Sequence, residues 1–260
     1  IVDPKKQNFN VYKHCTIFKP NLSEIKAGMN ITFNEDNIEN DITTKAIHQE
    51  TRQAQAFFIA KEEMVFAGKE IIIQGFKECS INQIQTDGAI IKKGEPIAML
   101  AGPIECFLKK ERVLLNLLQR LSGIASTTRS LVKILGPHNI QLLDTRKTTP
   151  GLRAFEKFAV FVGGGTNHRA SLQDAVMIKD NHLIGNQNIK DVVEKAAILN
   201  PEKDIQIEVD TKEELKTALT TKAPSLLLDN FSPKDLPLAI KTIRESEQGK
   251  AIYIELSGGI

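Results

Sequence analysis

The amino-acid sequence predicts an α/β protein whose C-terminal half is a parallel β-sheet wound with helices. Beyond residue 139, five apolar runs each end in a charged or small polar cluster. Such continuous runs are typical of strands that are buried on both faces. The polar residues that close them are 35, 29, 21 and 26 positions apart: Asp144, Lys179, Glu208, Asp229 and Glu255. A β/α unit needs about 30 residues, so the repeat favours a β/α barrel or an open doubly wound sheet.

The N-terminal half has a mixed pattern of short strands and helices. Its first thirty residues are polar and irregular, which predicts a peripheral arm. The apolar run within Thr51–Lys61 suits a strand, and Lys69–Gly75 continues a predicted helix that begins at Ala67. Residues 87–102 contain short apolar pieces broken by glycine and proline, a pattern typical of strands joined by tight turns.

Leucine spacing predicts an amphipathic helix over Glu111–Leu121. Leucines at 114, 117, 118 and 121 follow the i, i+3, i+4, i+7 pattern of one helix face. We expect Gly123 to break this helix before a second one over Thr127–Leu135.

Between the later apolar runs, three segments have helical character, at 188–199, 211–219 and 232–243. Thr211 and Glu214 have the spacing of a capping box at the start of the second segment. Ser232 and Asp235 have similar spacing at the start of the third.

Composition and charge exclude several classes of protein. Hydrophobic residues make up 41% and charged residues 25%, close to the average of globular proteins. The net charge of +2 is too small for a nucleic-acid-binding surface. No run approaches the ~20 apolar residues that span a bilayer, and the first residues have no secretory pattern. Three widely spaced cysteines without a CxxC pair indicate reduced thiols in a cytoplasmic protein.

Cations gather where the predicted strands end: Arg146, Lys147, Arg153, Lys157, His168, Arg169, Lys179 and His182. Two acids, Glu208 and Asp229, end separate strands. They can orient neighbouring cations, stabilise positive charge on a sugar ring, or hold Mg²⁺ among substrate phosphates. Arginine pairs bidentately with carboxylate or phosphate, and lysine supplies a point charge. The set suits a substrate with several negative charges plus a metal or sugar hydroxyls.

Two glycine segments favour the same kind of ligand. VGGGTNHR places three glycines before His168 and Arg169, and ELSGGI places two glycines after a predicted strand. Glycine lets backbone N–H groups approach an anion closely, although a double glycine alone is more often a turn.

Several of these residues also have a purely structural interpretation. Lys179 can be a strand-end lysine directed to solvent, an anion ligand or a Schiff-base nucleophile. His182 can cap a helix. Asp144 lies beside Arg146 in the sequence, so we expect a structural ion pair between them.

The segment DTRKTTPGLRAFEKFAVFVGGGTNHRASLQDAVMIKDNH resembles the signature of quinolinate phosphoribosyltransferases, also called carboxylating nicotinate-nucleotide pyrophosphorylases. Upstream, ERVLLNLLQRLSGIAS is similar to the helix that enters the family's barrel. EDNIENDITT is similar to the family's EDxGxGDxT segment, with Asn40 at a glycine position. Downstream, IEVDT, LLLDN and IELSGG follow in order. The resemblance extends from about residue 31 to the end.

The resemblance implies a type II phosphoribosyltransferase fold with three parts: an N-terminal arm over residues 1–30, an α/β sandwich domain over residues 31–119, and an incomplete β/α barrel of fewer than eight strands over residues 120–260. It also implies a homodimer. The family continues beyond the position of Ile260 with another strand, a glycine-containing phosphate loop and a helix, so we expect this sequence to lack the C-terminal part of the barrel.

The resemblance further implies a role for each site residue. Arg112 reaches into the partner subunit's site and, with Arg146, His168 and Arg169, holds the two quinolinate carboxylates. Lys147 and Lys179 face the phosphates, and Glu208 and Asp229 lie near the ribose hydroxyls and Mg²⁺, which the substrate diphosphate mostly holds. Ser257, Gly258 and Gly259 cradle the 5-phosphate, and Thr145 borders the pocket. The implied catalytic residues are Lys147, Lys179, Glu208 and Asp229.

The implied reaction transfers the phosphoribosyl group of phosphoribosyl diphosphate to quinolinate, with decarboxylation, during NAD biosynthesis. Its products are nicotinate mononucleotide, diphosphate and CO₂. Three alternatives stay open: a same-fold enzyme with another small acceptor, including a molybdenum-transport-associated homologue, a Schiff-base aldolase built on Lys179, and a non-catalytic dimeric binding protein. Four candidate cations for the acceptor carboxylates favour quinolinate.

Overall fold

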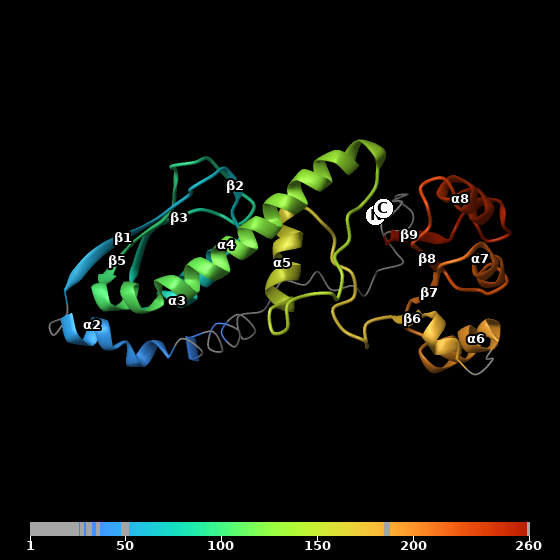
Figure 1. Ribbon diagram of the computed structural model, residues 1–260, viewed down its shortest axis with the longest axis horizontal. Helices are drawn as coiled ribbons and strands as arrows, with labels where there is room; N and C mark the ends of the chain where they lie inside the picture. Colours follow the sequence, from blue (N-terminus) through green and yellow to red (C-terminus); the bar gives the residue numbers. More distant parts are fainter. Residues whose placement is uncertain are drawn as a thin grey trace. The chain divides into compact units, whose positions relative to one another are not determined.

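The computed structural model describes residues 26, 29, 33–34, 37–47, 52–184 and 188–258 (Figure 1). The chain forms two compact units. The antiparallel unit includes Ile17–Ile134 and Lys147–Asn167, and the parallel unit includes Leu135–Arg146 and His168–Ile260. Among the described residues, no helix is both long enough and apolar enough to cross a membrane.

The antiparallel unit is built on a three-stranded sheet. Its order is β1 (Gln53–Ile59), β5 (Pro96–Pro103), β3 (Ser80–Ile84), and both pairings are antiparallel. The strand predicted within residues 51–61 is β1. A second, two-stranded pair joins β2 (Met64–Val65) to β4 (Ile90–Ile91).

Short helices and glycine turns complete this sheet region. The described helical elements here are η2 (Ile38–Asn40), α2 (Ile42–Ile47) and α3 (Lys69–Gly75). Gly88 and Gly94 have φ angles of 87° and 88° in the turns before β4 and β5. Glycine reaches this left-handed region without steric cost, which explains the predicted tight turns.

Helix α4 (Ile104–Leu135) is one continuous element of 32 residues, and the expected break at Gly123 is wrong. Glycine inside a helix costs only about 1 kcal/mol relative to alanine. On either side, Leu121 and Ala125 are buried in the core, and their packing outweighs that cost. The Ser122 hydroxyl also accepts a hydrogen bond of 3.2 Å from the Ala67 N–H, which fixes this stretch of helix. The expected domain boundary at residue 119 therefore falls inside α4.

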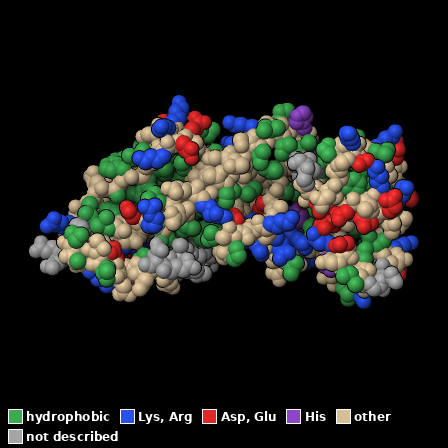
Figure 2. Space-filling model, in the orientation of Figure 1, with side chains coloured by type: hydrophobic (Ala, Val, Ile, Leu, Met, Phe, Trp, Pro, Cys, Tyr) green, Lys and Arg blue, Asp and Glu red, His purple; other side chains and the backbone are tan. Residues whose placement is uncertain are grey.

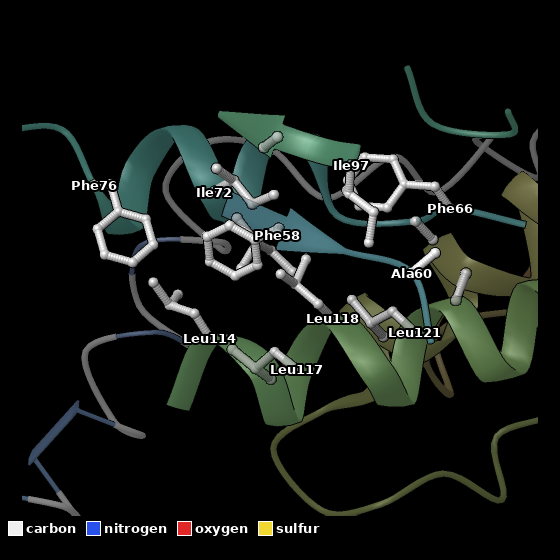
Figure 3. Packing of buried hydrophobic residues seen from close by; sticks show 14 of the residues in the cluster. Phe58, Ala60, Phe66, Ile72, Phe76, Ile97, Leu114, Leu117, Leu118 and Leu121 are labelled. Carbon is white, nitrogen blue, oxygen red and sulfur yellow. The ribbon is translucent and has the colours of Figure 1, made fainter. Parts of the chain in front are cut away.

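The core of the antiparallel unit lies between the strands and α4 (Figure 3). Helix α5 (Arg153–Gly163) adds Phe155 and Ala159 to it. The leucine face predicted from the sequence points into this core, and the residues that meet there include Phe58, Ile72, Ile97, Leu114, Leu117, Leu118 and Leu121.

The parallel unit contains a four-stranded parallel sheet. Its strands are β6 (Val176–Ile178), β7 (Ile205–Val209), β8 (Ser225–Asp229) and β9 (Tyr253–Ser257), in that spatial order. Helical elements in this unit are η3 (Gly136–His138), η4 (Asp180–Leu183), α6 (Ile189–Leu199), α7 (Lys212–Ala218) and α8 (Leu236–Glu245). Within the described chain the sheet does not close, as expected for an incomplete barrel.

The first of the five predicted strands, at residues 140–144, is not a full strand. Only isolated bridge residues occur there, at Gln141 and Leu143. A β-ladder needs consecutive paired residues. The apolar run at residues 140–144 lacks such pairing, so it does not form a strand. The other four predicted runs form β6 to β9.

The capping box predicted for α7 is confirmed. The Thr211 hydroxyl accepts a bond of 3.1 Å from the Glu214 N–H, and the Glu214 carboxylate accepts one of 3.1 Å from the Thr211 N–H. Ser232 and Asp235 bond to each other at 2.7 Å and 3.2 Å, but α8 begins only at Leu236. This second pair therefore closes a turn ahead of the helix.

The two faces of the parallel sheet differ in chemistry. One face packs against the helices and is apolar, with Ile178, Ile205, Ile207, Val209, Leu226, Leu228 and Ile254 in one core. We call it the apolar face. Side chains alternate across a strand, so the strand register assigns the other residues to a second face: Met177, Gln206, Glu208, Ser225, Leu227, Asp229, Tyr253, Glu255 and Ser257. We call this the polar face. The strands are largely buried, as predicted, but they are not apolar throughout.

Candidate active site

The candidate site lies on the polar face at the carboxyl ends of β6 to β9. Parallel strands bring these ends to one edge of the sheet, where ligands of open α/β sheets bind. Lys179 follows β6, Glu208 lies near the end of β7, and Asp229 ends β8 opposite Ser257 of β9. In the space-filling view, acidic side chains gather over this part of the parallel unit (Figure 2).

Lys179 and Glu208 form an ion pair across β6 and β7. The Lys179 backbone N–H donates to His182 Nδ1 at 2.9 Å, in the capping box of η4. The cap role considered for His182 is therefore confirmed. Lys179 does not simply project into solvent, because its ammonium group is held on the polar face.

Three carboxylates meet beside this ion pair. Oxygen atoms of Glu208, Asp210 and Asp229 all lie within 4.8 Å of one another. Burial, followed by the charges of Asp229 and Glu208, raises the pKa of Asp210. Hard carboxylate oxygens in this arrangement fit Mg²⁺. We call these residues the acidic trio.

Asp210 was not recognised from the sequence as a site residue. It stands two positions after Glu208, and the two-residue period of a strand places both on one face. That spacing was the available signal.

Arg146 and Arg169, which we call the guanidinium pair, contribute positive charge to the parallel unit. Arg169 donates to the Ala175 carbonyl at 3.5 Å and lies 3.1 Å from Met177 Sδ. Burial and then the charge of Arg146 lower the pKa of Arg169, against the opposing effects of Glu208 and Glu255. A second guanidinium close enough to act on half-buried Arg169 makes this part of the unit suited to an anionic ligand.

His168 is buried and held from two directions. Its ring Nε2 lies 3.3 Å from a carboxylate oxygen of Glu255, and its backbone N–H donates to Asp144 at 2.8 Å. Burial would raise the pKa of Glu255, but His168 and a hydrogen bond from Gln206 outweigh it and lower that pKa. The ion pair expected between Asp144 and Arg146 stays a prediction.

The end of β9 is joined to the end of β8 through Asn230. Asn230 has a left-handed backbone with φ of 55°, its N–H donates to the Ser257 carbonyl at 3.0 Å, and its side-chain amide donates to Asp229 at 3.0 Å. Gly258 has φ of 101°, and a Cβ there would lie 2.5 Å from Asn230 Oδ1. Only glycine fits this close approach. Gly259 lies outside the described residues.

The sequence assigned no role to Asn230, although it directly follows Asp229. Its position after a strand-end carboxylate, with a residue type that tolerates the left-handed region, was a weak signal. The contact with Gly258 depends on strand pairing and could not be found from local sequence.

The remaining predicted residues divide between the two units. Arg146, together with Thr145, belongs to the parallel unit, whereas Lys147 and Arg112 belong to the antiparallel unit, where Arg112 is exposed on α4. The predicted roles of Arg112 and Lys147 stay predictions. Lys157 is buried within α5.

The loop that follows Lys147 is fixed within the antiparallel unit. Arg120 of α4 donates to Glu156 of α5 at 2.8 Å and 2.5 Å and to the Thr149 hydroxyl at 2.5 Å. Glu156 also accepts from the Thr149 N–H at 3.2 Å. The TTPG segment is thus anchored at Thr149 by hydrogen bonds to Arg120 and Glu156, which form an ion pair with each other.

Comparison with protein families gives two matches that together span most of the chain. The model for the quinolinate phosphoribosyl transferase C-terminal domain matches residues 124–260, and that for the N-terminal domain matches residues 41–122.

Individual relatives agree with the family match. A probable nicotinate-nucleotide pyrophosphorylase [carboxylating] of Bacillus subtilis is 41% identical over 92% of this chain and 83% of its own length. The nicotinate-nucleotide pyrophosphorylase [carboxylating] of Mycobacterium leprae is 33% identical over 85% of this chain and 79% of its own.

Among solved structures, the nicotinate-nucleotide pyrophosphorylase from Francisella tularensis superposes with a TM-score of 0.85 at 35% identity. That match covers 94% of this chain and 86% of the other.

Proposed function

The chain belongs to the quinolinate phosphoribosyltransferase family and has the activity of its carboxylating nicotinate-nucleotide pyrophosphorylases, and we propose here a role for each site residue in that reaction. The enzyme is a pentosyltransferase of NAD biosynthesis. It converts quinolinate and phosphoribosyl diphosphate into nicotinate mononucleotide, diphosphate and CO₂.

The observation that carries the proposal is that both signs of charge stand on one polar face. The acidic trio suits a metal and ribose hydroxyls, whereas Lys179 and the guanidinium pair suit anions. Quinolinate is a dianion, and phosphoribosyl diphosphate is a polyanion that binds Mg²⁺. A site for quinolinate alone would need only positive charge.

Glu208, Asp210 and Asp229 would hold Mg²⁺ together with the substrate diphosphate. Magnesium typically uses one or two protein carboxylates plus substrate phosphates, and bound there it would neutralise charge on the leaving diphosphate. The same carboxylates face the ribose, where they stabilise positive charge at C1 as the bond to diphosphate breaks. Fixed charges of this kind supply a large part of enzymatic rate enhancement.

Arg146, Arg169 and His168 hold the two carboxylates of quinolinate. Arginine binds carboxylate bidentately, which also fixes the orientation of the pyridine ring. In a homodimer, Arg112 of the partner subunit would complete this set, and its exposure on α4 leaves it available for that role.

The phosphates are bound by lysines and by backbone donors. Lys179 and Lys147 face the phosphate groups, and Thr145 borders the pocket. Ser257, Gly258 and Gly259 cradle the 5-phosphate. Support comes from Gly258, whose positive φ and close approach to Asn230 form a turn that only glycine permits.

The chemistry then proceeds in two parts. The C1–oxygen bond breaks and diphosphate leaves, while the pyridine nitrogen donates its lone pair to C1. The ring becomes a cation and accepts the electron pair released when the adjacent carboxylate leaves as CO₂. A proton from water replaces that carboxylate. No covalent bond to the protein forms.

The test offers phosphoribosyl diphosphate and Mg²⁺ with quinolinate or with nicotinate, and follows mononucleotide and CO₂ together. We expect turnover with quinolinate alone and one CO₂ for each mononucleotide. Turnover with nicotinate alone, or mononucleotide without CO₂, would show that another acceptor is used. We also propose a cytoplasmic location, because the described cysteines Cys79 and Cys106 are free thiols.

A further inference from the structure

Four buried polar side chains form one connected group on the polar face. His168 is 9% exposed, Glu255 8%, Gln206 5% and Ser225 1%. The Gln206 amide donates to Glu255 at 2.7 Å and to the Ser225 hydroxyl at 3.1 Å. Glu255 in turn faces His168 Nε2 at 3.3 Å. The group crosses three strands, from β7 over β8 to β9.

Burial of this polar group lowers the stability of the fold unless its charges and hydrogen bonds are satisfied. Transfer of a carboxylate from water to a protein interior is unfavourable unless the charge is paired. An apolar side chain fits the same layer, because Leu227 stands opposite Glu255 in the strand register. Stability alone therefore does not account for a carboxylate at position 255.

The contacts of Glu255 indicate that it acts on the site through His168. Glu255 faces the His168 ring at Nε2, and His168 directly precedes Arg169 of the guanidinium pair. The His168 backbone is also tied to Asp144, two residues before Arg146. The histidine is therefore held at its backbone by one carboxylate and at its ring by another.

We propose that Glu255 is a positioning residue for the acceptor, which fixes the ring of His168 in the orientation that meets a pyridine carboxylate. The proposal rests on the proposed function of the site and adds a residue to it. Gln206 holds Glu255 in place, and Ser225 supports Gln206 from the other side.

The charges around His168 agree with this role. Glu255 lies on β9 and Asp144 on the segment before Arg146. The neighbouring Arg169 feels the charges of Arg146, Glu208, Glu255 and Asp174. The pairing with His168 and the bond from Gln206 lower the pKa of Glu255 despite its burial.

The first test replaces the carboxylate with its neutral isostere, Glu255→Gln. Binding of quinolinate is measured by titration calorimetry, and the KM values of quinolinate and phosphoribosyl diphosphate are measured separately. A hydrogen bond to a charged group contributes enough for a roughly tenfold to hundredfold weakening of quinolinate. The KM for phosphoribosyl diphosphate should change by less than about threefold, since the proposal assigns Glu255 to the acceptor alone.

A double-mutant cycle separates positioning from general damage. If Glu255 acts through His168, then Glu255→Gln should add almost nothing to the loss caused by His168→Asn. Ser225→Ala is a graded comparison: it removes a bond to Gln206 but leaves the Glu255–His168 pair, so it should weaken quinolinate less than Glu255→Gln does. A larger loss for Ser225→Ala than for Glu255→Gln would contradict the proposal. If Glu255→Gln fails to fold, Glu255→Asp moves the charge by one methylene and should weaken quinolinate in the same selective way.

Equal losses for both substrates, or fully additive losses in the double variant, would overturn the proposal. The wild-type protein in the same assay separates this failure from failure of the proposed function. If the wild type turns over quinolinate but the cycle is additive, only the role of Glu255 is wrong. If the wild type does not turn over quinolinate, the proposed function is wrong and this inference falls with it.

Discussion

The two faces of the β6–β9 sheet have different roles, although the same strands form both. On the apolar face, Leu226 and Leu228 of β8 pack with branched side chains of β7 and with the helices. On the polar face, the same strand carries Ser225 and Asp229. Adjacent residues of one strand thus serve the core and the site in alternation.

The difference shows where stability and chemistry are placed. The apolar face gains free energy as its area leaves water, about 25 cal/mol per Å². The polar face brings like charges together in the acidic trio and buries Glu255, both of which cost stability unless they are paired. A rigid apolar layer beneath the site can hold such groups close enough to bind a metal and anions.

The sharpest contrast comes from a change on the polar face, Glu208→Gln. This substitution keeps the shape but removes a charge that pairs with Lys179 and belongs to the acidic trio. We expect kcat to fall roughly 10³-fold, as for loss of one preorganised electrostatic group. Steady-state kinetics and thermal melting measure both effects, and a fall in melting temperature without loss of kcat would contradict the division of labour.

On the apolar face, Leu228→Ala should produce the opposite outcome. Leu228 is fully buried in the core of the parallel unit. Truncation of a buried leucine costs about 3 kcal/mol in the free energy of unfolding. Denaturant titration measures the loss, while kcat of the folded protein should stay within about twofold, because no atom of the site is removed.

A pair of glycines tests the turn at the end of β9. Gly258→Ala places a Cβ 2.6 Å from the Asn230 backbone nitrogen at a φ of 101°, which must shift either residue. Such strain costs about 1–3 kcal/mol, and we expect KM for phosphoribosyl diphosphate to rise roughly tenfold. Gly94→Ala is the control, because Gly94 has φ of 88° but no atom within 4 Å of an added Cβ. It shares the backbone strain and should leave this KM unchanged.

Asp210→Asn should raise the stability of the metal-free protein at neutral pH. Burial, then Asp229 and Glu208, raise the pKa of Asp210, so the folded state favours its protonated form. That stabilisation is present below the ordinary aspartate pKa and is lost as pH rises through the raised value. The variant's advantage in melting temperature should therefore appear above this window and shrink in acid. Saturating Mg²⁺ should reverse its sign, and an unchanged difference would remove Asp210 from the metal site.

The smallest expected effect is a gain, from Gly123→Ala in the middle of α4. An added Cβ meets no atom within 4 Å, and alanine favours the helix by about 0.5–1 kcal/mol. At Gly163 the same change places a Cβ 2.5 Å from Thr128 Cβ and should destabilise. Chemical denaturation of both variants tests whether packing or helix propensity governs each position.

The sequence alone predicted much of the site because its main residues directly follow apolar runs. Lys179, Glu208, Asp229 and Ser257 each stand at the end of a strand that was expected. The family resemblance added roles that no spacing could supply. The helices α6 to α8 and the cap of α7 were also predicted from local patterns.

What the sequence could not show depends on contacts between distant residues. Gln206 reaches Glu255, 49 positions away, and no local pattern joins them. Helix α4 continues through Gly123 because its neighbours are buried by β-strands that precede it in the chain. The segment at 140–144 has the apolar pattern of a strand but pairs only at isolated residues.

The most direct test of the central claim, that the carboxyl-end edge of the polar face is the substrate site, is amide hydrogen exchange. Exchange is measured with and without Mg²⁺ and phosphoribosyl diphosphate. We predict slower exchange at Lys179–Leu183, Asp210–Thr211, Asn230 and Ser257–Gly258, with little change in the outward parts of α6 to α8. Protection confined to the three-stranded sheet β1–β5–β3, with none at these strand ends, would contradict the account.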